Sequence, residues 1–384
     1  MTGRVDGPDK VTGRARYAFE HPVDGAAYVW AVPSAIAKGT IRSVDASPAL
    51  AVPGVLAVIT PDNAPRLPGT DDPELALFQS RVVAYRGQFV AAAVAGTPEV
   101  AREAAGLVVI DYEQAAHDVT LTADHPGLYK PDFVNPRYET DTAAGDFDGA
   151  FAAAAVRVDA TYRTPAEHNH PMEPHATVAS WHGDTLTVYD ATQGPSRTAG
   201  QVAAVLGLEP GQVRVIAEHV GGGFGAKGMP RANVILAAMA ARVTGRPVKC
   251  AVTRPQMFAV TGHRAPSIQR MRLGAGPDGR LTALCHDVID QTSTLKEFTE
   301  QSAVATRHMY AAPHRTAGPR TAWSGWTCPR RPGCGLRGSA RACSRWNRPW
   351  TSWPRRAVST RWSCGCGTSP PCTRRPASRS PAAT

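Results

Sequence analysis

Four glycines within residues 221–225 limit the fold of this chain more than any other feature, because no side chains cover the backbone there. An apolar run at residues 213–216 precedes them, and an alanine-rich segment at residues 233–241 follows. This order predicts a strand, a glycine turn and the start of a helix. Uncovered N–H groups at a helix N-terminus can bind an anionic or oxo-bearing ligand, so the turn is a candidate cofactor cradle. A plain tight turn is the alternative.

The turn matches neither of the common phosphate-binding patterns. Residues 221–227 read GGGFGAK, whereas a Walker motif would end in Gly-Lys-Ser/Thr. The dinucleotide fingerprint is satisfied only because the run is so rich in glycine. Lys227 could face a cofactor anion or lie in solvent at the start of the helix.

Five further motifs accompany the glycine run. They are RVDGPDKVTGRARY at residues 4–17, RGQFVAAAVA at 86–95, HNHPMEPH at 168–175, ATQ at 191–193 and TGHR at 261–264. In this order they resemble the molybdopterin-binding large subunit of the xanthine dehydrogenase and aldehyde oxidase family of molybdenum hydroxylases. The resemblance covers about residues 1–322, and the ordered combination is more specific than any single motif.

The resemblance implies roles for individual residues. Gln193 would lie near the oxo ligand of a pterin-bound molybdenum and is the expected catalytic residue. The cofactor-binding residues would be Gly222, Gly223, Phe224, Gly225, Ala226, Lys227 and Arg264, and the substrate-side residues would be Glu173, His170 and Gly228. Purine-oxidising members typically carry glutamate where Gly228 stands, and HNHPMEPH looks like the aldehyde-oxidising bacterial branch. The expected substrate is therefore an aldehyde or an aromatic heterocycle, and not xanthine.

Taken without the resemblance, these residues leave alternatives open. The histidines of the HNHPMEPH segment and Glu173 could bind a metal, although their spacing is not that of a known zinc site. A packing or substrate-side role and a plain surface loop are the other hypotheses, and we expect no directly bound metal. Glu173 could also be a buried acceptor beneath the glycine turn. Gln193 could be a surface amide, and Arg264 could form a structural salt bridge instead of binding a carboxylate or phosphate.

The hydrophobic patterns predict an α+β fold. By the resemblance, residues 17–123 would be an α/β hammerhead domain and residues 149–322 the first part of a molybdopterin-binding domain. Residues 1–16 would be an extended lead-in, and residues 124–148, rich in Pro, Asn, Asp and Gly, an interdomain linker. We expect strands at 28–32, 56–59, 107–111, 160–164 and 185–189, and helices at 98–106, 146–155 and 196–206, the last ended by Gly207.

The charge of the chain is unevenly distributed. A formal net charge of +10 would suggest an acidic partner such as nucleic acid. However, all 32 acidic residues lie at or before Glu300, and 15 of the 42 lysines and arginines lie after it. We therefore expect no nucleic-acid partner. No run of 18 apolar residues and no signal peptide is present, so we expect no membrane segment. The expected location is the cytoplasm, or the periplasm only if a partner subunit carries the export signal.

From residue 323 onward the composition changes abruptly. The segment holds six tryptophans, six cysteines and twelve arginines, and Leu336 and Val358 are its only Leu, Ile or Val residues. A basic cysteine-rich zinc or nucleic-acid module, a disordered tail and a shifted reading frame are the three hypotheses. Read from the third base of each codon, residues 342–353 can encode MFALESAMDEL, an amphipathic helix. We therefore favour an aberrant, disordered tail caused by one insertion or deletion between Pro319 and Trp326.

The resemblance also implies cofactors and partners. The intact protein would hold molybdenum-molybdopterin, in its cytosine dinucleotide form, and would oxidise a small molecule with oxygen from water. Cys250 and Cys285 do not match an iron–sulfur spacing and are expected to be buried and inert. The 2Fe–2S clusters and FAD would lie on an iron–sulfur subunit and an FAD subunit. The family's general-base glutamate would lie beyond this chain, which is expected to be inactive alone. A non-catalytic remnant or assembly module is the alternative, and a nucleic-acid-binding protein driven by the tail is the third.

Overall fold

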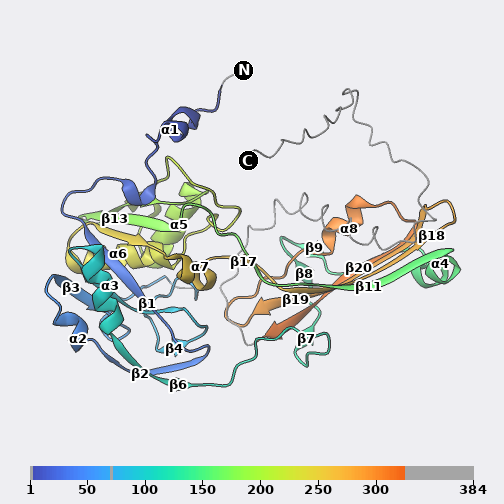
Figure 1. Ribbon diagram of the computed structural model, residues 1–384, viewed down its shortest axis with the longest axis horizontal. Coiled ribbons are helices and arrows are strands. Elements are labelled where there is room, and N and C mark those ends of the chain that lie inside the picture. The colour runs from blue at the N-terminus through green and yellow to red at the C-terminus, as the bar shows by residue number, and fades with distance from the viewer. Residues whose placement is uncertain (1–2, 70–71, 325–384) are drawn as a thin grey trace, which may run out of the picture.

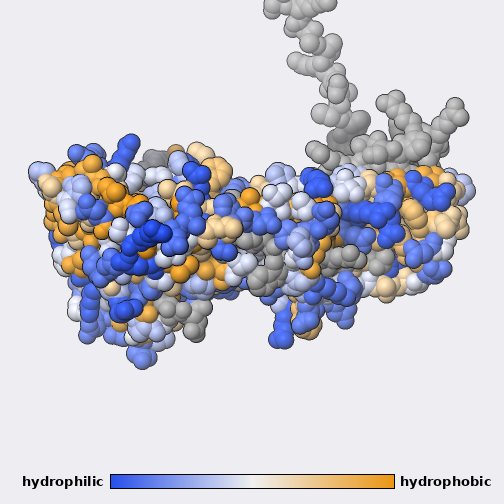
Figure 2. All heavy atoms as spheres, turned by 90° about the horizontal axis from the view of Figure 1, so that it is seen from below, coloured by the Kyte–Doolittle hydropathy of each residue, from blue (hydrophilic) through white to orange (hydrophobic). Residues whose placement is uncertain are grey.

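The computed structural model describes residues 3–69 and 72–324. They form two lobes that lie side by side along the longest axis of the molecule (Figure 1). One lobe is built on a seven-stranded sheet and the other on a six-stranded sheet. On the face shown in Figure 2, polar and charged residues are interspersed with smaller apolar patches over both lobes.

The seven-stranded sheet combines strands from distant parts of the sequence. Its order is β15-β14-β13-β16-β1-β5-β3. The strands are β1 (Ala27–Pro33), β3 (Val55–Ile59), β5 (Phe89–Ala95), β13 (Ala176–His182), β14 (Thr185–Asp190), β15 (Val213–Ile216) and β16 (Val248–Ala251). β1 pairs antiparallel with β5 on one side and parallel with β16 on the other. Strands from the first 95 residues and from residues 176–251 therefore share one sheet.

Helices cover this sheet and bury its apolar side chains. The helices of this lobe are α2 (Ser47–Leu50), α3 (Pro98–Leu107), α5 (Pro195–Leu206), α6 (Ala232–Thr244) and α7 (Arg254–Val260). In α6 every residue from Ala232 to Ala241 is buried, as expected of a helix that is apolar on all sides. It packs on β13 and β16 and contributes to the largest hydrophobic core of the described residues. A smaller sheet, in the order β4-β2-β6, lies in the same lobe, with β2 (Gly39–Asp45), β4 (Val82–Val83) and β6 (Val109–Gln114).

The six-stranded sheet forms the second lobe. It contains β7 (Leu128–Tyr129), β10 (Thr142–Ala144), β11 (Val156–Thr164), β18 (Ser267–Ala275), β19 (Leu281–Ser293) and β20 (His314–Ser324). The pairing of β19 with β20 is parallel, and the other pairings are antiparallel. The helices α4 (Phe147–Ala153) and α8 (Val304–Met309) accompany it. Two short ladders pair β8 (Phe133–Val134) with β9 (Tyr138–Glu139), and β12 (Glu167–His168) with β17 (His263–Arg264).

The α+β class and the expected helices and strands are confirmed to within a few residues. The helix expected at 196–206 is α5, and Gly207 ends it in the left-handed conformation at φ 67°. The lead-in is not wholly extended, because α1 (Gly7–Val11) forms within it. Pro8 lies in the first turn of α1, and the Lys10 ammonium lies 2.7 Å from the Asp6 carboxylate, one helical turn away.

The stretch at residues 124–148 is more ordered than a plain linker. It forms the short strands β7 to β10, of which β7 and β10 both pair with β20. These pairings give hydrogen-bond partners to backbone N–H and C=O groups of the stretch. Its turn-rich composition did not indicate those partners. Within the described residues, no helix combines the length and apolar character needed to cross a membrane. The expected aberrant tail lies outside the described residues from residue 325 onward.

Candidate functional site

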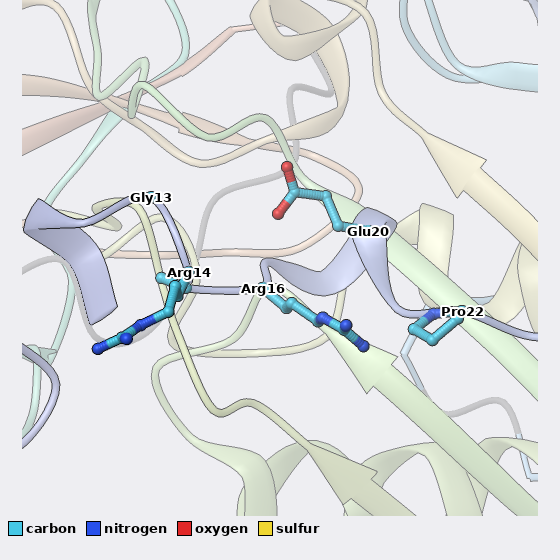
Figure 3. A pocket seen from close by; sticks show the side chains of 6 residues that line it. Gly13, Arg14, Arg16, Glu20 and Pro22 are labelled. Carbon is cyan, nitrogen blue, oxygen red and sulfur yellow. The ribbon is translucent and has the colours of Figure 1, made fainter. Parts of the chain in front are cut away.

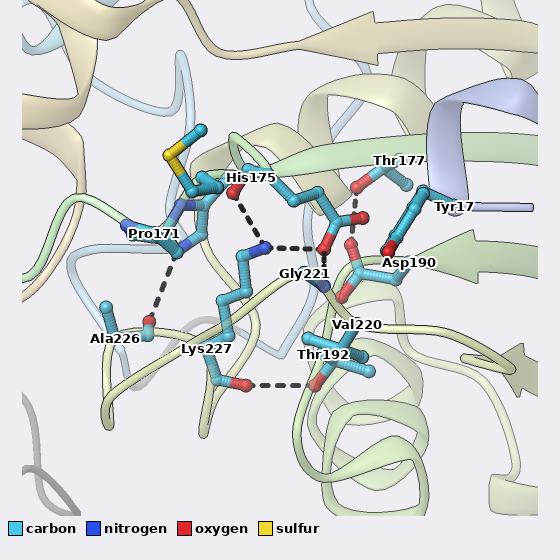
Figure 4. Close-up of polar contacts among 12 residues, drawn as sticks. Tyr17, Pro171, His175, Thr177, Asp190, Thr192, Val220, Gly221, Ala226 and Lys227 are labelled. Carbon is cyan, nitrogen blue, oxygen red and sulfur yellow. Dashed lines mark hydrogen bonds and ion pairs between the residues drawn. The ribbon is translucent and has the colours of Figure 1, made fainter. Parts of the chain in front are cut away.

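Two sequence motifs contact the glycine loop, which we define as residues 221–227. The loop leaves the sheet after β15 and leads toward α6. Residues 169–175, which precede β13, and residues 191–193, which follow β14, both form hydrogen bonds to it (Figure 4). Segments that are up to 58 positions apart in the chain are thus assembled into one site.

Glu173 holds both ends of the glycine loop. Its Oε2 accepts from the N–H of Gly221 at 2.7 Å, and its own N–H donates to the Gly221 carbonyl at 3.2 Å. The Lys227 ammonium donates to the Glu173 carbonyl at 2.9 Å and to Oε2 at 2.8 Å (Figure 4). The Lys227 side chain is 0% exposed, so it is not solvated at a helix start. Burial lowers the pKa of Lys227, and the Glu173 carboxylate opposes that shift.

The middle of the loop is held by two side-chain amides. Asn169 Nδ2 donates to the Phe224 carbonyl at 2.6 Å, and the N–H of Gly225 donates to Gln193 Oε1 at 3.2 Å. Because Oε1 must face that N–H, the NH2 end of the Gln193 amide is directed away from Gly225. Phe224 is 61% exposed and has a φ of 52°, in the left-handed region that favours glycine.

The end of the loop is tied to the protein interior through its carbonyl groups. Arg231 Nε donates to the Ala226 carbonyl at 3.3 Å, and His175 Nε2 lies 3.2 Å from the same oxygen. The Lys227 carbonyl accepts from the N–H of Gln193 at 2.8 Å and from the Thr192 hydroxyl at 3.1 Å. These contacts anchor the backbone of Gln193 as well as the loop.

Close packing explains why glycine occupies two of the loop positions. A Cβ atom at Gly223 would lie 2.3 Å from Gln193 Oε1, and one at Gly221 would lie 2.5 Å from the Glu173 Cβ. Both distances are far below ordinary contact, so a side chain at either position would displace its neighbour. Gly228 is different, because a Cβ there would lie 3.6 Å from the nearest atom, the Gly225 carbonyl oxygen.

The expectation that the loop opens a helix is wrong. α6 begins only at Ala232, after Pro230 and an irregular turn, so the loop N–H groups do not lie at its N-terminus. The N–H groups at positions 221, 225 and 226 are used within the site. Within the described part of the chain, those of Gly222, Gly223 and Phe224 have no hydrogen-bond partner. Three adjacent unused donors fit an oxo-bearing or anionic ligand.

The histidines of the HNHPMEPH segment take part in ring packing. The His168 ring stacks on His263 with centroids 5.0 Å apart, and the His170 ring lies 4.2 Å from that of Phe258. Burial lowers the pKa of His168, which favours its neutral form. Among the residues that the structure describes, no group of three His, Cys, Asp or Glu side chains is arranged to hold a metal ion.

The remaining predicted residue and the missed ones lie around this assembly. Arg264, on β17, pairs with the Glu300 carboxylate at 3.3 Å while 34% of its side chain is exposed. Asn169, Thr192 and Arg231 contact the loop but were not identified from the sequence. Asn169 lies inside the HNHPMEPH motif and Thr192 inside the ATQ motif. This position was the only feature of the sequence that could have indicated their role.

A separate hollow lies where the lead-in meets the body of the protein. Its lining residues are Gly13, Arg14, Ala15, Arg16, Glu20 and Pro22. In Figure 3 the Arg14 and Arg16 side chains point to opposite sides, so they do not converge on a common ligand. The candidate site is therefore the glycine loop and not this hollow.

Comparison with known proteins identifies the domains of this chain. Residues 12–116 match the a/b hammerhead domain of aldehyde oxidase and xanthine dehydrogenase, and residues 130–323 match a molybdopterin cofactor-binding domain. The chain belongs to this family. The hammerhead domain followed by the start of a molybdopterin-binding domain is thereby confirmed. The two matched segments do not coincide with the two lobes, because β1 from the first shares a sheet with β13 to β16 from the second.

Several members of the family are similar to this chain. The aldehyde oxidoreductase molybdenum-binding subunit PaoC of Escherichia coli is 39% identical over 322 residues, which are 83% of this chain and 43% of PaoC. The nicotinate dehydrogenase large molybdopterin subunit of Eubacterium barkeri is 30% identical over 315 residues, covering 79% of this chain and 72% of that subunit. This chain therefore spans less than half the length of PaoC.

Solved structures of the family have the same fold. Aldehyde oxidoreductase from Desulfovibrio gigas matches with a TM-score of 0.69 and 26% identity, covering 85% of this chain and 39% of that one. Quinoline 2-oxidoreductase from Pseudomonas putida 86 matches with a TM-score of 0.70 and 25% identity, covering 85% and 44%.

Proposed function

We propose that this chain provides the cofactor-binding part of a molybdenum hydroxylase that oxidises aldehydes or aromatic N-heterocycles with oxygen from water. One observation carries the proposal. The three unused N–H groups at residues 222–224 lie next to Gln193, whose NH2 end is directed away from the loop. A set of donors with no partner in the protein is what a bound oxo or anionic group requires.

The residues of the loop have distinct roles in this proposal. When bound, the molybdopterin cofactor supplies the molybdenum chemistry of the reaction. The N–H groups of Gly222, Gly223 and Phe224 would bind its oxygen-bearing or anionic side, and the Gln193 NH2 group would donate to an oxygen ligand and orient it. Gly225 and Ala226 complete the loop backbone. Lys227 and Glu173 would support the loop from beneath, and Arg264, whose side chain is partly exposed, would bind a cofactor phosphate.

The proposed substrate class rests on three positions around the loop. Gly228 leaves open the place where purine-oxidising members carry glutamate, and a side chain there would meet only ordinary contacts. Phe224 presents an exposed aromatic ring, and His170 lies against Phe258. The absence of a carboxylate at position 228 disfavours a purine, and the aromatic rings favour an aldehyde or another aromatic N-heterocycle. The similar proteins from E. coli and P. putida are an aldehyde oxidoreductase and a quinoline 2-oxidoreductase.

The remaining redox groups are proposed to lie on partner subunits. Cys250 and Cys285 are both buried, and neither belongs to a group of possible metal ligands within the described residues. An iron–sulfur subunit and an FAD subunit would therefore transfer electrons, and the pterin would carry a cytosine dinucleotide. We propose a cytoplasmic location, with export only through a partner's signal. As an isolated polypeptide the chain would be inactive.

We also propose that a frame change lies between Pro319 and Trp326. The match to the molybdopterin-binding domain ends at residue 323, where the composition rich in tryptophan, cysteine and arginine begins. Resequencing the corresponding codons tests this directly. A restored frame would continue with acidic residues and helical periodicity, whereas an unchanged reading would contradict the frame change.

Metal content tests the proposed function. The frame-restored chain, co-produced with its iron–sulfur and FAD subunits, is expected to contain about one molybdenum per chain, measured by inductively coupled plasma mass spectrometry. Acid treatment should release CMP, detected by chromatography. A folded complex that contains no molybdenum would contradict the proposal and would leave the chain as an assembly module that only binds partners.

A further inference from the structure

One peptide group in the glycine loop is held on both of its edges. The carbonyl of Phe224 and the N–H of Gly225 belong to the same planar peptide group. Asn169 Nδ2 donates to that carbonyl at 2.6 Å, and that N–H donates to Gln193 Oε1 at 3.2 Å. The two hydrogen bonds therefore form a continuous chain from one side-chain amide, through the backbone, to the other.

The conformation of this peptide group needs support. Phe224 has a φ of 52°, which glycine adopts freely and phenylalanine rarely does. Of the two positions before Phe224 and the two after it, three are glycine. A further glycine at position 224 would relieve the backbone strain, but the chain keeps a strained phenylalanine there. Asn169 Oδ1 is buried and has no partner among the described residues. Leaving that acceptor unpaired costs stability. The stabilising contact of the Asn169 side chain is therefore its hydrogen bond to the Phe224 carbonyl.

The orientation of Gln193 depends on the same peptide group. Gln193 is exposed, and its terminal amide could turn by half a rotation if nothing selected one end. The Gly225 N–H selects Oε1, because in the opposite orientation the Gln193 NH2 group, which is also a donor, would face it. The direction of that N–H follows the peptide plane, which Asn169 holds from its opposite edge.

We propose that Asn169 is a positioning residue for Gln193, acting through the Phe224–Gly225 peptide. It keeps the Phe224 ring directed outward and fixes which end of the Gln193 amide faces away from the loop. The ligand that Gln193 would meet rests on the proposed function, whereas the coupling between Asn169 and Gln193 does not.

Limited proteolysis of the cofactor-free chain tests the coupling. Chymotrypsin cleaves after exposed aromatic residues, and Phe224 is 61% exposed. Asn169→Ala should speed cleavage after Phe224 about 2- to 10-fold, the range expected for losing one hydrogen bond. Asn169→Asp keeps the size but loses the donor and should behave in the same way. Cleavage after Phe133, which is 52% exposed, is the internal reference.

A control variant separates local from general effects. Gln212→Ala also removes an amide, one that contacts Asp184 and the N–H of Glu209 but not the loop. It should leave cleavage after Phe224 unchanged. Unchanged cleavage in both Asn169 variants, with the same unfolding midpoint as the unmodified chain, would overturn the proposal.

A double-mutant cycle tests whether the two amides act as one unit. Gln193→Ala alone should also speed cleavage, and the double variant should be cleaved no faster than the faster single variant. If the two fold-changes multiply instead, the amides act independently and the proposal is overturned. In the molybdenum-loaded complex, Asn169→Ala should lower kcat about tenfold with KM unchanged, and not lower it further in a Gln193→Ala background. Coupled proteolysis without molybdenum binding would uphold the coupling and contradict the proposed function.

Discussion

The Lys227 ammonium and the Glu173 carboxylate lie 2.8 Å apart, with side chains that are 0% and 9% exposed. They are 54 residues apart in the sequence. The same Glu173 oxygen also accepts from the N–H of Gly221, so a single carboxylate joins the first and last residues of the glycine loop. The loop is thus closed by a buried ion pair and not by contact with solvent.

Breaking this ion pair on one side should strongly destabilise the protein. Glu173→Gln leaves the buried Lys227 ammonium without its countercharge and should lower the free energy of unfolding by about 3–5 kcal/mol. Lys227→Met should have a similar effect by isolating the carboxylate. The double variant should lose less than the sum, because no unpaired charge remains. Urea denaturation followed by circular dichroism measures all three, and strictly additive losses would show that the two groups do not interact.

Substitution by alanine should impair the site at Gly223 but not at Gly200, which lies outside the site. Gly223→Ala places a Cβ 2.3 Å from Gln193 Oε1, so Gln193 must move away from its observed position. Molybdenum content or kcat of the loaded complex should fall at least about tenfold. Gly200→Ala on α5, where a Cβ would meet no atom within 4 Å, is the matched control and should leave both quantities unchanged. Equal activity of the two variants would contradict a role for the position of Gln193.

Stability should fall in mild acid because of His286. This side chain is 1% exposed, with Nδ1 2.6 Å from the Thr306 hydroxyl and Nε2 3.1 Å from Gln269 Oε1. Burial lowers the pKa of His286 to about 4, against about 6.5 in an unfolded chain. Between these values the unfolded chain binds a proton that the folded chain does not, so stability decreases as the pH falls. The decrease attributable to His286 should reach roughly 3 kcal/mol near pH 4.

A non-titrating replacement isolates this contribution. His286→Gln keeps a polar side chain but removes the protonation step. Urea midpoints measured at pH 7, 6, 5 and 4 should fall less steeply for the variant than for the unmodified chain. Parallel pH profiles would mean that other groups cause the acid sensitivity.

The two cysteines of the body should resist thiol reagents. Burial raises the pKa of Cys250 to about 12 and that of Cys285 to about 11, so almost no thiolate is present at pH 8. Iodoacetamide at pH 8 should label neither in the native protein and both in urea, as measured by peptide mass mapping. Mapping separates them from the six cysteines after residue 325. Native labelling of Cys250 would show that its region opens.

Local sequence patterns predicted most of the individual elements. Strand β15, helix α3 and the end of α5 at Gly207 follow from periodicity and from the conformational preferences of single residues. These signals operate within a few residues and need no knowledge of the rest of the chain. The same is true of the motifs that led to the family, since each is read from adjacent positions. The candidate loop and Gln193 were identified in this way.

The sequence by itself therefore determined most of the elements, the family and the position of the loop. Only the tertiary structure decided that β1 pairs with β16, that Lys227 turns inward to Glu173, and that Asn169 reaches the Phe224 carbonyl. Each of these is a contact between residues more than 50 positions apart. Burial and hydrogen-bond partners depend on which remote segments pack together, and neither dihedral preference nor hydrophobic period contains that information.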